Sequence, residues 1–180
     1  MKDLSYHILD IVRNSIQAGA SRIETDITES SMTGQLILSI RDNGRGMSAA
    51  MVKKVTDPFF TTSGGKKVGL GLPLLKQNTE LTGGVFSIES AEKKGTTVTA
   101  IFNRHHIDMI PTGDLAMTFR TLIAGNPDKD FIYRYRADEE GFDLDTAEIR
   151  KDLDGVNLNT REVLDYITDF IRENARALKK

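Results

Sequence analysis

The chain has 180 residues, no cysteine and a formal net charge of −2, with 39% hydrophobic and 28% charged residues. These values are typical of a soluble globular protein of one domain, or one domain with an appendage, and they exclude disulfides, thiolate metal sites and a cysteine nucleophile. The near-neutral charge and the lack of a signal-peptide core or a membrane-length apolar run predict a cytoplasmic protein that binds neither nucleic acid nor a membrane.

Residues 3–18 have the spacing of an amphipathic helix. One side carries an apolar stripe in which Ser15 also falls, formed by Leu4, Ile8, Ile11, Val12 and Ser15. The opposite side carries short hydrogen-bonding side chains within about a quarter of the circumference, namely His7, Asp10, Asn14 and Gln17. Such side chains suit a binding site better than long lysines and glutamates do, although a solvated face is the simpler explanation of this helix taken by itself.

Period-two alternation predicts two strands, at 21–29 and 35–42, joined by a hairpin turn at Thr33-Gly34. Apolar residues alternate with polar ones, so one face of the sheet is expected to be covered and the other in contact with water. The second strand ends at Asp42, whose side chain falls on the covered face with that of Ile40. A carboxylate on that face is costly unless a partner satisfies it.

The segment that begins with this carboxylate is Asp42-Asn43-Gly44-Arg45-Gly46-Met47. Gly44 and Gly46 allow backbone conformations that other residues avoid, and they let another molecule approach closely. Taken alone, the segment has two explanations, a binding site and an acidic surface turn that ends a strand.

A short helix is predicted from Ser48 to about Val55, and the segment after it has no regular period. Its two adjacent aromatics, glycines and lysines predict a mobile loop with an apolar anchor. Gly69-Leu70-Gly71-Leu72-Pro73 then leads into a helix through about Leu81. A glycine-rich loop before a helix N-terminus can bind an anion, because free N–H groups and the positive end of the helix dipole meet there. A flexible linker before a helix is the alternative.

Two further strands are predicted at 85–91 and 96–103, and Thr96 falls on the covered face of the second. The order of helix, two strands, short helix, loop, helix and two strands predicts an α+β protein. Its architecture is a two-layer α/β sandwich, with a mixed sheet and helices on one face.

Residues 105–180 have a different character and predict a small α+β extension. A helix should start near Thr112 and stop at Gly125, and two more are predicted at 146–153 and 160–177. Between the first and the second of these helices, Tyr133-Arg134-Tyr135-Arg136 is interpreted as part of a partly buried edge hairpin, with a nucleic-acid contact as the alternative. The pair His105-His106 is not expected to bind a metal, because adjacent strand residues point to opposite faces.

In this order and spacing, the motifs resemble those of the GHKL superfamily of ATP-binding domains, the Bergerat fold. The superfamily unites gyrase B subunits, the heat-shock 90 chaperones, sensor histidine kinases and mismatch-repair ATPases. The resemblance covers about residues 1–104, so it implies an ATP-binding domain there and leaves residues 105–180 as an extension of unknown role.

The resemblance implies a site for ATP and Mg²⁺. Residues 10–20 resemble the N box, with Asn14 at the position that binds Mg²⁺, and Gly95-Thr96 resembles the G3 box, whose threonine lies beside the adenine-binding aspartate. Asp42 matches the G1-box aspartate that accepts the adenine amino group. The other positions implied to bind the nucleotide are Gly44, Gly46 and Met47 of the G1 box, Phe59, Phe60, Thr61 and Thr62 of an F box in the ATP lid, Lys67 in the lid, and Gly69, Leu70, Gly71 and Leu72 of the G2 box.

Asp10 occupies the position at which the family's ATPases carry a glutamate general base. It shares a helix face with Asn14 but is one methylene shorter than glutamate. Asp10 is therefore a candidate general base, and a residue that orients the Mg²⁺ ligands is the alternative. Gln17 matches neither the aspartate of mismatch-repair ATPases nor the lysine of histidine kinases, whereas the Phe-Phe-Thr-Thr lid is of the histidine-kinase type.

The resemblance also implies what the reaction could be. Histidine kinases carry a dimerisation and phosphoacceptor domain before this domain, and this chain has none, so a complete autophosphorylating sensor is not expected. Three functions stay open: a phosphotransferase acting on a separate protein, a slow ATPase that acts as a conformational switch, and a nucleotide-gated binding module without turnover.

Overall fold

The computed structural model describes residues 3–57 and 70–178. Within them the elements are α1 (Leu4–Gln17), β1 (Arg22–Ser30), β2 (Gln35–Asp42), α2 (Ala49–Val52), α3 (Gly71–Leu81), β3 (Val85–Ala91), β4 (Gly95–Asn103), α4 (Leu115–Gly125), β5 (Asp130–Ala137), β6 (Glu140–Asp145), α5 (Thr146–Asp152) and α6 (Arg161–Ala177). The predicted helices and strands outside the lid are confirmed to within a few residues. The predicted lid falls largely on 58–69, outside the described residues.

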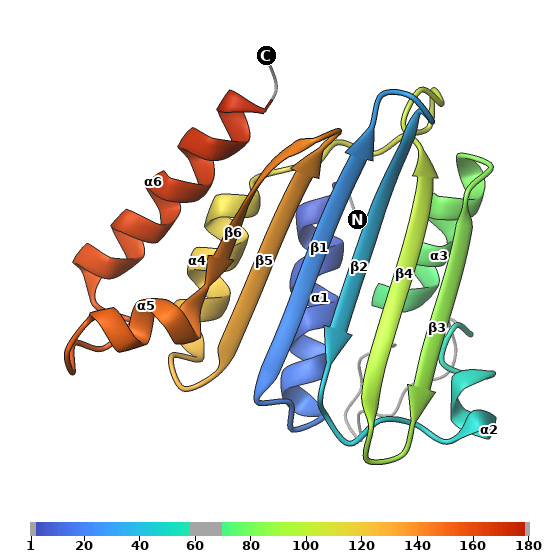
Figure 1. The fold of residues 1–180 in the computed structure, drawn as a ribbon. Coiled ribbons are helices and arrows are strands. Elements are labelled where there is room, and N and C mark those ends of the chain that lie inside the picture. Colours follow the sequence, from blue (N-terminus) through green and yellow to red (C-terminus); the bar gives the residue numbers. More distant parts are fainter. Residues whose placement is uncertain (1–2, 58–69, 179–180) are drawn as a thin grey trace.

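The strands form one six-stranded sheet in the order β3-β4-β2-β1-β5-β6. Neighbouring strands are antiparallel except β1 and β5, which are parallel, so the sheet is mixed as predicted. Helices α1, α3 and α4 lie together on one side of the sheet (Figure 1). The expected two-layer α/β arrangement is therefore confirmed.

The apolar stripe of α1 explains how this helix is held against the sheet. Leu4, Ile8 and Val12 are completely buried, and they join the inward side chains of β1 and β2 in the core. The helix begins after Asp3, whose side chain accepts a hydrogen bond from the backbone N–H of Tyr6. This packing presents the last turns of α1 to the end of β2, where Asp42 lies.

The second half of the chain continues the same sheet and the same core. Strand β5 pairs with nearly all of β1, and β6 returns beside it as the antiparallel hairpin that the sequence predicts. Tyr133 stacks on Phe119 with ring centroids 4.3 Å apart and meets Phe142 edge to face. One sheet and one apolar core therefore include residues from both sides of residue 104.

The arginines of β5 form ion pairs on one face of the sheet. On the face opposite Tyr133, the guanidinium of Arg134 binds the carboxylates of Glu24 and Asp26 at 3.0 and 2.9 Å. These two acids belong to β1, the parallel neighbour of β5. The alternation of tyrosine and arginine therefore reflects a buried face and an ion-paired face of one strand.

Candidate functional site

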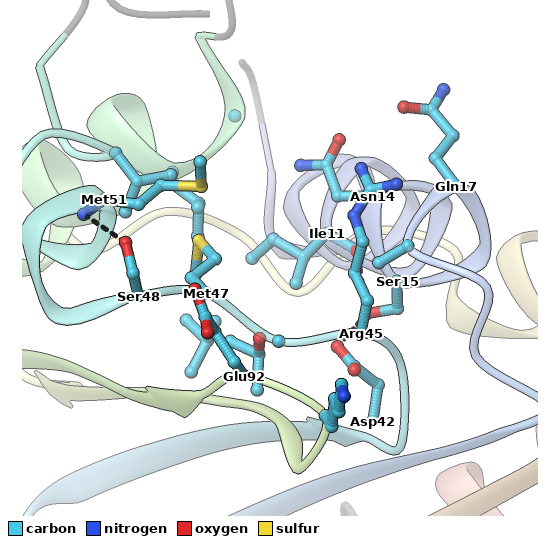
Figure 2. A pocket seen from close by; sticks show the side chains of 18 residues that line it. Ile11, Asn14, Ser15, Gln17, Asp42, Arg45, Met47, Ser48, Met51 and Glu92 are labelled. Carbon is cyan, nitrogen blue, oxygen red and sulfur yellow. Dashed lines mark hydrogen bonds between the residues drawn. The ribbon is translucent and has the colours of Figure 1, made fainter. Parts of the chain in front are cut away.

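A pocket of about 640 Å³ opens where the C-terminal half of α1 faces the ends of β2 and β4. This volume lies in the range of ~300–1,000 Å³ typical of small-ligand sites. Its lining comes from four stretches of the described chain, and Figure 2 shows most of the polar members. The lining residues are Ile11, Asn14, Ser15, Gln17, Ala18, Asp42, Arg45, Gly46, Met47, Ser48, Met51, Val55, Gly71, Leu72, Glu92, Lys93, Thr96 and Val98.

Asp42 lies at the base of the pocket with only 8% of its surface exposed. Its Oδ2 accepts a hydrogen bond from Ser15 Oγ at 2.7 Å, and its Oδ1 accepts one from the backbone N–H of Gly44 at 2.8 Å. Both donors are neutral. A carboxylate has about four lone-pair positions, so Asp42 is held in place and retains acceptor capacity toward the pocket.

Thr96 is the cross-strand partner of Asp42 in the pairing of β2 with β4. Its hydroxyl lies 2.8 Å from Ser90 Oγ, which also donates to the carbonyl of Gly95 at 2.9 Å. Because the Ser90 hydroxyl has a single hydrogen, Thr96 is the donor in their shared bond. Ser90 in turn accepts from the backbone N–H of Met47 at 2.9 Å. A small hydroxyl network therefore fixes this wall of the pocket.

The glycines of this region are required by the fold. At Gly46 the backbone φ is +66°, and a Cβ would lie 1.9 Å from the carbonyl oxygen of Ala91. At Gly95 the φ is +86°, and a Cβ would lie 1.9 Å from the carbonyl oxygen of Asp42. Each glycine therefore lets two backbone segments of the pocket wall approach closely. The sequence suggested that another molecule could approach Gly46 closely. In the structure, it is the protein's own backbone that lies close to this residue.

Backbone hydrogen bonds hold the segment after Asp42 on both sides. The N–H of Arg45 donates to the carbonyl of Ala18 at the end of α1, and its carbonyl accepts from the N–H of Lys93 at 2.7 Å. Arg45 thus connects α1 to the β3–β4 turn. Its side chain lines the pocket and is labelled in Figure 2.

The polar side of α1 divides into three environments. Asn14 is exposed and lines the pocket. Asp10 is half-buried beside the first turn of α3, where a Cβ on Gly71 would lie 3.3 Å from its own Cβ. His7 is fully buried, and its Nε2 lies 2.8 Å from Asn78 Nδ2. Burial lowers the pKa of His7 to about 4, so the ring is neutral at neutral pH. His7 is therefore not at the pocket, although the helical pattern grouped it there.

Helix α3 starts at the pocket rim. Gly71 and Leu72 line the pocket, and the N-cap residue Leu70 supplies no side-chain hydrogen bond to the first turn. Pro73 has no N–H to satisfy. The arrangement leaves backbone N–H groups of a helix N-terminus at the pocket, the geometry that suits an anion.

The structure brings together seven of the residues that the sequence implicated, all lining the pocket: Asn14, Asp42, Gly46, Met47, Gly71, Leu72 and Thr96. Gly44 and Asp10 lie beside it through the contacts given above. Leu70 is 45% exposed and does not line the pocket. The remaining six predicted positions lie outside the described residues: Phe59, Phe60, Thr61, Thr62, Lys67 and Gly69.

Ser15 has a contact that the sequence pattern did not reveal. The helical spacing put it in the apolar stripe, and it is indeed 4% exposed, but its hydroxyl serves Asp42. A hydroxyl in an otherwise apolar stripe was the available signal, because a buried hydroxyl needs a partner. Arg45 and Ser90 carried no such signal, because their contacts depend on which segments the fold brings together.

The donor set also fits a magnesium ion that is carried by a phosphate ligand. No group of three or more His, Asp and Glu side chains that could hold a metal occurs in the described ranges 3–57 and 70–178. Mg²⁺ does not need such a group, because it keeps several waters and shares its shell with phosphates. The amide of Asn14, exposed at the pocket, offers one neutral oxygen of the kind that this ion accepts.

Comparison with known families identifies the family to which this chain is related. Residues 2–106 match the model of the histidine kinase-, DNA gyrase B- and HSP90-like ATPase family. The chain belongs to this family. The matched segment contains every residue that lines the pocket.

By their names, the curated relatives include sensor and signal-transduction histidine kinases. The sensor histidine kinase ZraS of Escherichia coli is 31% identical over 96 residues, which are 53% of this chain and 20% of ZraS. The histidine-protein kinase AtoS of Escherichia coli is 36% identical over 95 residues, 52% of this chain and 16% of AtoS. The chain therefore spans about a fifth or less of the length of these relatives. Among the described residues, no helix combines the length and apolar character of a membrane span.

The likeness to solved structures concerns the fold. The ATPase domain of MutL from Aquifex aeolicus, solved with ADP, superposes with a TM-score of 0.53 at 13% identity, covering 86% of this chain and 68% of that one. This coverage exceeds the span of the family match, so it includes part of the second half of the chain. The six-stranded α+β fold is thus that of a GHKL domain.

Proposed function

We propose that the chain binds Mg-ATP in this pocket and transfers the γ-phosphoryl group to a separate protein. The observation that carries the nucleotide assignment is the buried carboxylate of Asp42, which neutral donors hold at the base of a pocket next to Thr96. A carboxylate that is desolvated and left with spare acceptor capacity is satisfied best by a ligand that donates hydrogen bonds.

Asp42 selects adenine over guanine. The exocyclic amino group of adenine is a donor to the carboxylate, whereas guanine presents a carbonyl oxygen at the same ring position. Two acceptors facing each other in a buried site leave both unsatisfied. The apolar side chains of Met47, Met51 and Val98 line the same pocket and suit a flat base.

The phosphate end of the nucleotide is assigned to the α1–α3 side. The N–H groups at the start of α3 would face the phosphates, and the Asn14 amide oxygen would complete the shell of Mg²⁺. When bound, the ion neutralises phosphate charge and orients the γ-phosphoryl group. ATP is a cytoplasmic metabolite, which supports a cytoplasmic site of action.

Asp10 is the candidate general base. It lies half-buried next to Gly71, one helical turn before Asn14. In the transfer, the bond between the γ-phosphorus and the bridging oxygen of ADP breaks, a nucleophile of the partner protein bonds to the phosphorus, and Asp10 would accept the nucleophile's proton. If water is the nucleophile instead, the same residues perform ATP hydrolysis and the chain is a slow ATPase switch.

One experiment separates these reactions. The protein is incubated with γ-labelled ATP and Mg²⁺, with and without a cell lysate from which small molecules have been removed. Label on a second protein supports the transferase, and released phosphate alone supports the ATPase. ATP binding without either product supports a nucleotide-gated binding module, and an absence of ATP binding overturns the assignment of the pocket.

A further inference from the structure

The polar seam between α1 and α3 contains a buried contact that the proposed site does not use directly. His7 and Asp10 lie one turn apart on α1 and face α3, while Asn14 continues the same side into the pocket. His7 meets Asn78, and Asp10 packs beside Gly71. The seam thus leads from the interior of the helix layer to the pocket rim.

The two contacts hold α3 at two points along its length. Asn78 lies seven residues after Gly71, which is about two turns, so both residues are on one side of α3. Both helices also contribute apolar side chains to the core, among them Ile8 and Ile11 of α1 and Leu75 of α3. Apolar contacts are non-directional, whereas a hydrogen bond of 2.8 Å restricts both sliding and rotation of one helix against the other.

The protonation state of His7 makes this bond persistent. The ring has no exposed surface, and burial lowers its pKa to about 4. The neutral ring has one acceptor nitrogen, and Nε2 receives the amide hydrogen of Asn78 in this role. The pair is therefore intact throughout the neutral pH range.

We propose that His7 and Asn78 are positioning residues that set the phosphate half of the nucleotide site. By fixing α3 on α1, they hold the first turn of α3, with Gly71 and Leu72, in register with Asp10 and Asn14. This inference rests on the proposed function, because it concerns how the same pocket treats the phosphates. The adenine half is built on β2 and β4, and among the described residues the hydrogen-bond partners of Asp42 are Ser15 and Gly44, not this pair.

Two leucine variants and one rescue variant test the proposal. His7→Leu and Asn78→Leu remove the hydrogen bond while filling the space with an apolar side chain. In His7→Gln, the side-chain carbonyl oxygen replaces Nε2 as the acceptor. Gln77→Leu, on the exposed side of α3, is the matched control. Thermal unfolding curves of all variants are recorded first, and binding is measured at a temperature at which every variant is folded.

Binding of ATP and of adenosine is then measured, by calorimetry and by a chemical-shift titration. We expect His7→Leu and Asn78→Leu to weaken ATP binding about tenfold, the size of one buried hydrogen bond. Adenosine binding should stay within about twofold of the unmodified chain. His7→Gln should restore most of the ATP affinity, and the double leucine variant should be no weaker than either single variant.

The outcomes separate this proposal from the proposed function. If the folded leucine variants bind ATP like the unmodified chain, the pair only packs the helices together and the positioning role is overturned. An equal loss for ATP and adenosine also overturns it, because the effect would not be confined to the phosphates. If the unmodified chain binds no ATP, the assignment of the pocket fails before any variant is compared.

Discussion

Two carboxylates lie on the covered face of the sheet, one at each end, and their partners differ. Asp42, at the pocket end, is held by a hydroxyl and a backbone N–H. Glu29, at the other end, accepts from the hydroxyl of Tyr135 and is paired with Arg104 at 2.9 Å. A partly buried acid that is paired with a cation is satisfied within the protein, whereas a buried acid whose partners among the described residues are neutral donors can still bind a ligand.

If Asp42 binds the adenine as proposed, the contrast separates a structural acid from a ligand-binding one, and the largest effect should come from Asp42. In Asp42→Asn, the side chain presents a donor as well as an acceptor to the adenine amino group. We expect a loss of ATP affinity of at least about 100-fold, or about 3 kcal/mol, with a small change in stability. Calorimetry with ATP and with GTP measures it. Normal ATP binding by this variant would show that the base binds elsewhere.

Acidification should act on another buried group, His7. Its pKa is lowered to about 4 in the folded chain and is about 6.5 when the chain is unfolded, so protons bind the unfolded state more readily. Its effect on stability is absent above pH 6.5 and grows to a loss of about 3 kcal/mol near pH 4. Urea unfolding from pH 7 to 4 measures this loss.

His7→Gln provides the comparison, since glutamine does not titrate while the acceptor is retained. The difference in unfolding free energy between the two proteins should narrow or reverse as the pH falls. A difference that is independent of pH would contradict the buried neutral state of His7. Carboxylates also titrate in this range, and they cancel in the difference.

Glu29→Gln should have the opposite signature to Asp42→Asn. The substitution removes the charge that pairs with Arg104, which is partly exposed, so we expect a loss of about 2 kcal/mol of unfolding free energy. ATP affinity should stay within about twofold of the unmodified value. A substantial loss of ATP binding would mean that the two ends of the sheet are coupled, and the contrast drawn above would be wrong.

Ser15→Ala tests how firmly Asp42 needs its hydroxyl partner. Removing the 2.7 Å hydrogen bond should weaken ATP binding about five- to tenfold, or about 1 kcal/mol, because the carboxylate is less well oriented. Ser5→Ala, the same substitution in the first turn of the same buried helix face, is the control. Equal ATP affinities for the two variants would remove Ser15 from the site.

The smallest effects should come from the two tyrosines of β5. Among the described residues, Tyr133 Oη is buried without a hydrogen-bond partner, whereas the hydroxyl of Tyr135 donates to Glu29. Tyr133→Phe should leave the unfolding free energy unchanged or raise it by up to about 1 kcal/mol, and Tyr135→Phe should lower it by about 1 kcal/mol. Parallel urea unfolding curves measure both, and a larger loss for Tyr133→Phe would indicate an unrecognised partner.

The sequence predicted the parts of this fold that local patterns determine. The parity of β2 indicated that Asp42 points inward, and the covered face of β4 placed Thr96 with it, as the register confirms. Helical periodicity gave the faces of α1 but not what lies opposite each face. For that reason His7 was grouped with the side chains that suit a binding site, and Ser15 was placed in the apolar stripe without a partner.

Local sequence patterns do not show which distant strands pair with each other. The hairpin of β5 and β6 follows from alternation and a turn, but no local pattern shows that β5 lies parallel to β1. The ion pairs of Arg134 with Glu24 and Asp26 depend on that pairing. The sequence therefore indicated an α+β extension at residues 105–180 but not that its two strands continue the same sheet.

The parallel pairing of β1 with β5 has a consequence for how the chain is made. Asp26 and Arg134 are register partners 108 residues apart. Until β5 has left the ribosome, β1 is an edge strand with unpaired backbone groups, the kind of surface that pairs with other chains. The nucleotide pocket is encoded almost entirely before that point. Truncation after β4 would therefore keep the pocket residues but expose an aggregation-prone edge. In the full chain, β5 covers this edge of β1 once it has been synthesised.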